Sequence, residues 1–225
     1  MVNALMQHLE AERREVVPEE DGEWAIYSGG EFLSGSFLGV AGVTSRELSF
    51  PSQEAGREFL AAALAAVGFP VTAEHVLTAL GLGVRWLRER NLRRVLWLGQ
   101  DDLRDYLADE GIETVTGGPC DAVVLGADPT MAVASLEKAL APLLEDGVDL
   151  VCLNRNPYFR DSRGIRRYGP GAWAAALATL GGSGRTVTVG KPSETIYNEG
   201  LKRVGAVPSE ALFISDDPPA DLVTA

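Results

Sequence analysis

The amino-acid sequence predicts an α/β protein with a mostly parallel sheet. Short runs of β-branched and other apolar residues alternate along the chain with longer segments of helical periodicity. These runs are apolar at successive positions, as buried parallel strands are when helices cover both faces of their sheet. Apolar residues make up 46% of the 225 positions and charged residues 23%, which is the balance of a globular chain with a substantial core.

The predicted elements follow one another in a regular order after residue 52. Several helices have a capping residue at their start, such as Thr72 or Ser193. The expected strands are 95–98, 122–125, 150–153, 186–189 and 212–214, and the expected helices are 53–67, 73–90, 101–110, 131–144, 172–180 and 193–204. Ligands of open parallel sheets bind beyond the carboxyl ends of the strands, so we expect the chemistry in the residues that follow each strand.

Charge and composition exclude several classes of protein. The net charge of −12 would repel a phosphate backbone, so we expect no nucleic-acid partner. No apolar run approaches the roughly 20 residues that cross a membrane, and the charged N-terminal stretch is unlike a signal peptide, so we expect no membrane partner. Two cysteines without Cys-x-x-Cys spacing favour a reducing, cytoplasmic location. The sequence contains only two histidines, which argues against a His-based zinc site or a Ser-His-Asp triad.

A lysine follows the fourth predicted strand. Residues 186–189 lead directly into Gly190-Lys191-Pro192-Ser193 and then into a predicted helix. The N–H groups and the dipole at a helix N-terminus favour an anion, which makes Lys191 a candidate phosphate clamp. The spacing is not that of a Walker A loop, because Pro192 occupies the position of the magnesium-binding Ser or Thr. The alternative interpretation is an exposed lysine in a turn.

An acidic cluster follows the last predicted strand and contains Asp216, Asp217 and Asp221. Carboxylate oxygens are the ligands that Mg²⁺ prefers, and a bound cation relieves their mutual repulsion. Asp216 and Asp221 are therefore candidate metal ligands. The alternative is an acidic helix cap, in which Asp216 or Asp217 accepts hydrogen bonds from free N–H groups next to Pro218.

The order of these motifs resembles that of a known family. The order resembles the second half of the haloacid dehalogenase (HAD) superfamily: Gly-Lys-Pro-Ser-x-x-x-Tyr is followed by a helix, an apolar strand and Asp-x-x-x-x-Asp. The resemblance is to the NagD-like, 4-nitrophenylphosphatase-like class IIA branch. Upstream segments also resemble this branch, among them Thr44-Ser45-Arg46, Glu74-His75-Val76-Leu77-Thr78 and Asn154-Arg155-Asn156-Pro157. The resemblance therefore extends over about residues 44–225.

The resemblance implies a fold, a cofactor and roles for single residues. The implied fold is a Rossmann-like HAD core with a parallel sheet, formed by residues 1–55 and 171–225, and an inserted α/β cap domain of residues 56–170. Lys191 matches the phosphate clamp of the family's motif III, and Asp216 and Asp221 match the acidic motif IV, which binds Mg²⁺. Asn154 and Arg155 match the cap region that shapes the substrate pocket, which implies a small phosphorylated or acidic ligand.

The first two family motifs are altered in this sequence. The family reaction uses Asp-x-Asp-Gly, in which the first Asp attacks phosphorus and the second is the general acid and base. In the best-fitting segment, residues 24–33, these positions hold Tyr27 and Gly29. Neither suits the role, because a tyrosine hydroxyl ionises near about pH 10 and glycine has no side chain. Ala41 stands where motif II has a Thr or Ser hydroxyl.

A second alignment of motif I places Glu19 and Asp21 before Gly22. It requires a very short strand, and a glutamate displaces the attacking oxygen by roughly 1 Å. We therefore expect a catalytically degenerate phosphatase-like protein that keeps a phosphate- and Mg²⁺-binding half site, with the metal held weakly or not at all. The alternative is an active Mg²⁺-dependent phosphatase of small phosphorylated metabolites that uses Glu19 and Asp21. A third alternative is a non-enzymatic homo-oligomer that is joined through the cap and has a purely structural role.

Overall fold

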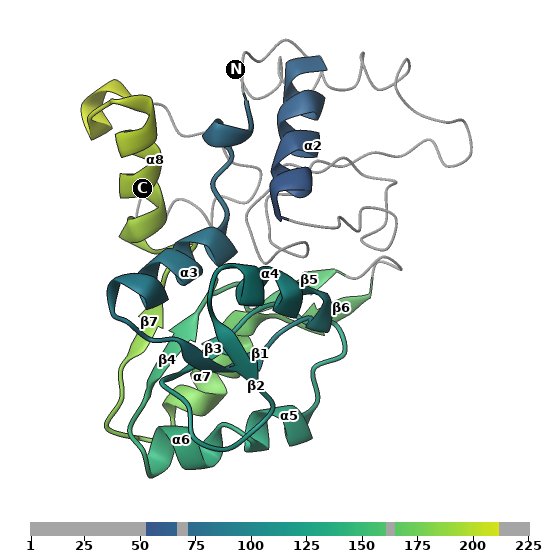
Figure 1. The fold of residues 1–225 in the computed structure, drawn as a ribbon, viewed down its shortest axis with the longest axis vertical. Helices are drawn as coiled ribbons and strands as arrows, with labels where there is room; N and C mark the ends of the chain where they lie inside the picture. The colour runs from purple at the N-terminus through teal and green to yellow at the C-terminus, as the bar shows by residue number, and fades with distance from the viewer. Residues whose placement is uncertain (1–52, 67–71, 161–164, 212–225) are drawn as a thin grey trace.

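The computed structural model describes residues 53–66, 72–160 and 165–211 (Figure 1). Lys191, Asn154 and Arg155 fall within these ranges. The other candidate residues of the sequence analysis lie outside the described residues, as does the expected strand 212–214: Glu19, Asp21, Tyr27, Gly29, Ala41, Asp216, Asp217 and Asp221.

A five-stranded sheet with the order β2-β1-β3-β4-β7 forms the centre of the described structure. Its strands are β1 (Arg94–Leu98), β2 (Glu113–Val115), β3 (Ala122–Leu125), β4 (Asp149–Cys152) and β7 (Thr186–Thr188). All neighbouring strands are parallel, and their register aligns Leu98, Leu125, Cys152 and Thr188 at the carboxyl edge. The predicted α/β class and parallel sheet are confirmed.

The described helices are mostly short. The α-helices are α2 (Gln53–Ala66), α3 (Ala79–Glu89), α4 (Arg104–Asp109), α5 (Val133–Glu137), α6 (Leu140–Leu144), α7 (Pro170–Ala178) and α8 (Glu194–Val204). Three 3₁₀ turns, η1 (Ala73–His75), η2 (Asp101–Leu103) and η3 (Pro208–Glu210), accompany them. None of the described helices combines the length and the apolar character of a membrane-spanning segment.

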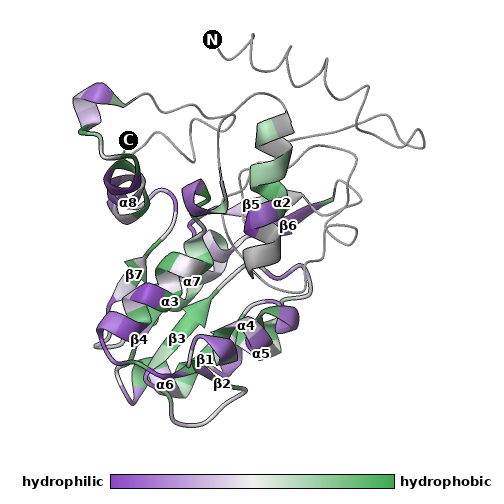
Figure 2. Ribbon diagram, turned by 45° about the horizontal axis from the view of Figure 1, so that its top comes forward, coloured by the Kyte–Doolittle hydropathy of each residue, from purple (hydrophilic) through white to green (hydrophobic). Residues whose placement is uncertain are grey.

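Helices cover both faces of the sheet (Figure 1). Along β1, Val95 and Trp97 belong to a buried cluster that includes residues of α3, α4 and α8, whereas Leu96 and Leu98 belong to a second cluster with residues of α5, α6 and α7. This alternation follows from the two-residue period of a strand. Figure 2 shows β3 in the hydrophobic colour at the middle of the sheet, as expected for a strand covered on both sides.

Two of the long helices expected from the sequence are interrupted. The expected helix 73–90 is the turn η1 followed by α3, because Thr78 has an extended backbone and its side chain accepts a hydrogen bond from the Gly81 N–H. That bond makes Thr78 the N-cap of a new helix. The expected helix 131–144 divides into α5 and α6. Pro142 has no N–H to donate to the carbonyl of Lys138, which prevents one continuous helix.

An antiparallel hairpin was not predicted from the sequence. Its strands are β5 (Tyr158–Arg160) and β6 (Arg166–Tyr168), with Tyr158 opposite Tyr168 and Arg160 opposite Arg166. These segments consist of arginines and aromatic residues, so they lack the apolar runs that marked the strands of the main sheet.

The main sheet extends across the predicted boundary between cap and core. β7, which was assigned to the core segment 171–225, pairs with β4 of the predicted cap, and α7 packs against β4 as well. The predicted limit at residues 170 and 171 therefore falls between elements of one sheet. The domain limits stay a prediction.

Candidate functional site

The residues that follow β7 place Lys191 at the carboxyl edge of the sheet. The Val189 N–H donates to the carbonyl of Cys152 over 3.1 Å, and the Gly190 N–H donates to the carbonyl of Leu153 over 3.0 Å. Backbone pairing thus continues past the last residue of β7. Lys191 comes next and is only 7% exposed, which excludes the alternative of an exposed lysine in a turn.

The end of β4 brings Asn154 and Arg155 next to Lys191. The Arg155 N–H donates to the backbone carbonyl of Lys191 over 3.0 Å. Asn154 is buried, and its Oδ1 accepts a hydrogen bond from the Asn156 N–H over 3.1 Å. Arg155 is exposed. The fold therefore joins the candidate phosphate clamp to the two candidate substrate-binding residues, whose roles stay predictions.

A buried thiol supports the turn at Asn154. The Cys152 Sγ donates to the carbonyl oxygen of Asn154 over 2.7 Å. Burial is the main reason that the pKa of this thiol rises to about 12, so the thiol stays protonated and remains a donor at neutral pH. The sequence analysis took Cys152 only as an indicator of the redox compartment, and this contact becomes visible once the strand order is known.

Two residues beyond Lys191, Ser193 caps the N-terminus of α8. Its Oγ accepts a hydrogen bond from the Thr195 N–H over 3.2 Å, and its own N–H donates to the carbonyl of Gly190 over 2.8 Å. The Lys191–Pro192 peptide bond is cis. An 11-residue helix leaves unpaired N–H groups at this end, where they favour an anion. A buried cation beside a helix N-terminus is an arrangement that can hold a phosphate group.

Two glycines fix the loop that carries Asn154 and Arg155. The Gly169 N–H donates to the carbonyl of Pro157, and the Gly171 N–H donates to the carbonyl of Asn156, each over 2.9 Å. A Cβ atom at Gly171 would overlap the carbonyl oxygen of Arg155. The N-terminal end of α7 therefore holds this loop in place through close backbone contact, which only glycine permits.

The hairpin β5–β6 continues directly from this loop. Tyr158 and Tyr168 are 55% and 66% exposed, and the Arg166 guanidinium lies 5.3 Å from the centre of the Tyr158 ring. Exposed aromatic and cationic groups therefore follow Asn154 and Arg155 in the structure. The two tyrosines are candidate ligand contacts that the sequence analysis missed, because it did not identify these two segments as strands.

The metal half of the candidate site lies elsewhere in the chain. Asp216 and Asp221 lie outside the described residues, as do Glu19 and Asp21 of the alternative motif I. Within residues 53–66, 72–160 and 165–211, no group of three or more His, Cys, Asp or Glu side chains is placed to hold a metal ion. The Mg²⁺ assignment therefore rests on the donor chemistry of Asp216 and Asp221.

Comparison with known sequences identifies the family of this chain. The haloacid dehalogenase-like hydrolase family model matches residues 42–225. The haloacid dehalogenase-like hydrolase domain-containing protein 2 of Rattus norvegicus is 28% identical over 180 residues, which cover 80% of this chain and 66% of that protein. The match to the Homo sapiens protein of the same name covers 54% of its length. The chain thus spans between half and two thirds of these relatives.

Solved structures extend the likeness to the fold. A p-nitrophenyl phosphatase from Archaeoglobus fulgidus matches with a TM-score of 0.63 and 26% identity, covering 75% of this chain and 64% of that one. A glycerol phosphate phosphatase from Mycobacterium tuberculosis in complex with magnesium matches with a TM-score of 0.53 and 29% identity, covering 66% of this chain and 46% of that one. The resemblance inferred from the motifs is confirmed: the chain belongs to the haloacid dehalogenase-like hydrolase family, and its structural neighbours lie in the NagD-like, p-nitrophenylphosphatase branch.

Proposed function

We propose that this chain is a catalytically degenerate phosphatase of the HAD family, which binds a small phosphorylated ligand without efficient turnover. The observation that carries the proposal is the combination of a buried Lys191 beside Asn154 with Tyr27 and Gly29 at the two motif I positions. The family model matches from residue 42 onward, downstream of the segment that holds Tyr27 and Gly29. The clamp for a phosphoryl group is kept, and the groups that attack and protonate are replaced.

Loss of the nucleophile and of the general acid and base removes the covalent route. Deletion of such groups commonly costs a factor of about 10³ or more in rate, whereas binding and electrostatic contributions survive. Asp216 and Asp221 would hold a Mg²⁺ ion, which neutralises phosphate charge when bound. The family site also takes a carboxylate from motif I, so we expect the ion to be held weakly here.

An active Mg²⁺-dependent phosphatase that uses Glu19 and Asp21 is the second candidate. The names of the structural neighbours favour it, since one is a p-nitrophenyl phosphatase and another a glycerol phosphate phosphatase in complex with magnesium. This function requires that the carboxylates of Glu19 and Asp21 lie opposite Lys191 and that Asp216 is a ligand of the Mg²⁺ ion.

Hydrolysis of p-nitrophenyl phosphate in the presence of Mg²⁺ separates the two functions. We expect no turnover above a buffer control in the wild-type chain, and the same result for Glu19→Ala, Asp21→Ala and Asp216→Ala. Asp217→Ala is the matched control, because Asp217 is adjacent to Asp216 and lies outside the motif pattern. The active phosphatase would be established instead by turnover in the wild-type chain that is lost in Asp216→Ala and in either Glu19→Ala or Asp21→Ala. The same turnover should remain in Asp217→Ala.

A binding measurement tests the other half of the proposal. We expect inorganic phosphate to bind the wild-type protein, and we expect Lys191→Met to remove the part of this binding that occurs at the half site. Methionine keeps an apolar stem of similar length and lacks the ammonium group. Phosphate binding that does not change in Lys191→Met would contradict the half site.

A further inference from the structure

A cavity of about 580 Å³ lies along α3, between this helix and residues of α2, α4 and α8. Its volume is within the range of small-molecule sites, which is about 300–1,000 Å³. Lys191, Asn154 and Arg155 do not belong to its lining. The cavity is therefore separate from the candidate phosphate clamp described above.

Arginine dominates the charged lining of this cavity. Five arginines line it against two glutamates, although acidic residues outnumber basic ones by 32 to 20 in the whole chain. The arginines are Arg57, Arg85, Arg88, Arg93 and Arg203. A concave surface lined by one sign of charge concentrates the electrostatic field and attracts ligands of the opposite sign.

Several of these arginines have fixed partners that build the walls. Arg88 forms an ion pair with Glu110 over 2.6 Å, which joins α3 to the end of α4. Arg85 forms an ion pair with Glu199 of α8 over 2.7 Å. Arg203 donates to the backbone carbonyl of Glu74 over 2.9 Å. These contacts hold the guanidinium groups of two helices, α3 and α8, around the cavity.

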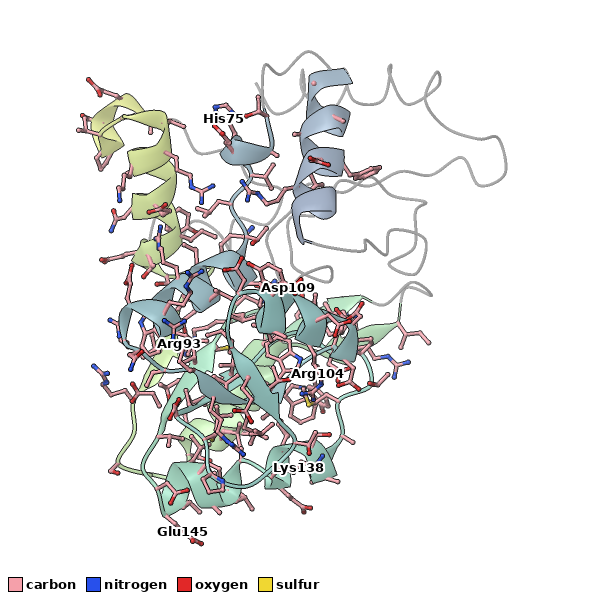
Figure 3. The ribbon with its side chains drawn as sticks, viewed as in Figure 1. His75, Arg93, Arg104, Asp109, Lys138 and Glu145 are labelled. Atoms are coloured by element: carbon pink, nitrogen blue, oxygen red, sulfur yellow. The ribbon has the colours of Figure 1, made fainter. Side chains whose placement is uncertain are left out.

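Arg93 differs from the other cavity arginines. It lies between α3 and β1 (Figure 3), and its backbone N–H donates to the Asp121 carboxylate over 2.8 Å. Its guanidinium makes no hydrogen bond or ion pair with any of the residues that the structure describes. A planar guanidinium presents a fork of N–H donors that matches two oxygens of a phosphate group.

The rest of the lining adds a buried hydroxyl and apolar side chains. Burial is the main cause that raises the pKa of Tyr106, and a hydrogen bond to Glu110 contributes, so its hydroxyl stays protonated at neutral pH and donates to that carboxylate. Leu77 and Leu82 are among the apolar residues that line the cavity. The site thus combines cationic donors for an anionic group with room for a small apolar body.

We propose that this cavity is a second ligand site, which binds the phosphate group of a small molecule between Arg88 and Arg93. The proposal rests on the excess of arginine in the lining, on the size of the cavity and on the guanidinium of Arg93, which has no partner within the described part of the chain. It does not depend on turnover at the family site.

Titration of inorganic phosphate into the Lys191→Met variant at constant ionic strength tests this site alone. We expect saturable binding below about 10 mM, and a loss of about tenfold or more in affinity when Arg93→Gln is added to this background. Arg94→Gln is the matched control, since Arg94 is the adjacent arginine, pairs with Glu113 and does not line the cavity. Circular dichroism verifies that each variant folds.

Two results would overturn the proposal. One is the absence of saturable phosphate binding in a folded Lys191→Met protein, or in Lys191→Gln if the methionine variant does not fold. The other is an equal affinity for phosphate in the Lys191→Met protein and in the Lys191→Met, Arg93→Gln double variant. Loss of all phosphate binding in Lys191→Met together with an intact wild-type signal would support the family half site and exclude the cavity, so the two proposals fail independently.

Discussion

At the scale of single residues, the position of Lys191 depends on one close contact. The Gly190 N–H donates to the carbonyl of Leu153, and a Cβ atom at residue 190 would overlap both that carbonyl oxygen and the Cβ of Ala79. Glycine is thus required by the approach of two backbone segments. Because Ala79 begins α3, the same contact joins the first residue of that helix to the loop that carries Lys191.

We expect Gly190→Ala to destabilise the protein by about 1–3 kcal/mol, since the added methyl group must displace backbone atoms. Gly200→Ala is the control, because Gly200 lies within α8 and a Cβ atom there would meet no described atom within 4 Å outside its own helix turn. At that position the change removes the low helix propensity of glycine and should stabilise by about 0.5–1 kcal/mol. Urea unfolding midpoints measure both effects. Equal midpoints for Gly190→Ala and wild type would contradict the close contact.

At the scale of elements, an ion pair joins α3 to α8. Arg85 Nη1 lies 2.7 Å from Glu199 Oε1, and the Glu199 side chain is only 11% exposed. Arg203 also lies close to Glu199, at 3.3 Å. The hydrogen bond from Arg85 is the main reason that the pKa of Glu199 falls below its ordinary value. Folding therefore favours the ionised form of this carboxyl group.

This shift gives the Arg85–Glu199 pair a defined pH dependence. A folded-state pKa below the unfolded value stabilises the protein above the unfolded pKa of about 4.3, and the contribution disappears as the pH falls through the folded pKa. We expect Glu199→Gln to lower the free energy of unfolding by about 0.5–1 kcal/mol at about pH 7, and by less at about pH 3.5. Urea unfolding at both pH values measures the difference. Glu137→Gln, at an exposed position of α5, is the control. If Glu199→Gln lowers the free energy of unfolding equally at both pH values, the contribution does not come from the ionised Glu199 carboxylate.

The elements show how far the sequence determines the fold. The strand 122–125 was predicted with its observed bounds, because its residues are apolar throughout and Asp121 precedes it. β2 and the β5–β6 hairpin were missed, since Thr114, Arg160 and Arg166 give no apolar run. These strands form through pairing with a neighbour, which local periodicity does not reveal.

The candidate site was partly predictable for a related reason. Lys191 and Asn154 each follow an apolar run, so the rule that ligands bind beyond strand ends located both. That β4 and β7 are neighbours is a property of the strand order, which the sequence does not state. The arginine-lined cavity was not predicted, because Arg57 and Arg203 reach it from distant parts of the chain.

At the scale of the whole molecule, the sheet and its two covering layers form a unit that includes α7 and β7. β7 supplies the only partner of β4 on the side away from β3, among the described strands. Ala174 and Leu177 of α7 belong to the same buried cluster as Leu150 and Cys152 of β4. A domain that ended at residue 170 would leave β4 as an edge strand and expose this part of its apolar face.

This arrangement predicts how fragments of the chain behave. A fragment of residues 56–211 should unfold cooperatively on heating, whereas the predicted cap alone, residues 56–170, should lack a cooperative transition. The shorter fragment loses the β4–β7 hydrogen bonds and the contacts of α7, and a domain whose net stability is only about 5–15 kcal/mol does not tolerate such a loss. Thermal unfolding followed by circular dichroism compares the two fragments. A cooperative transition of residues 56–170 at the midpoint of the longer fragment would instead support a cap that ends at residue 170, with β7 as an addition to its edge.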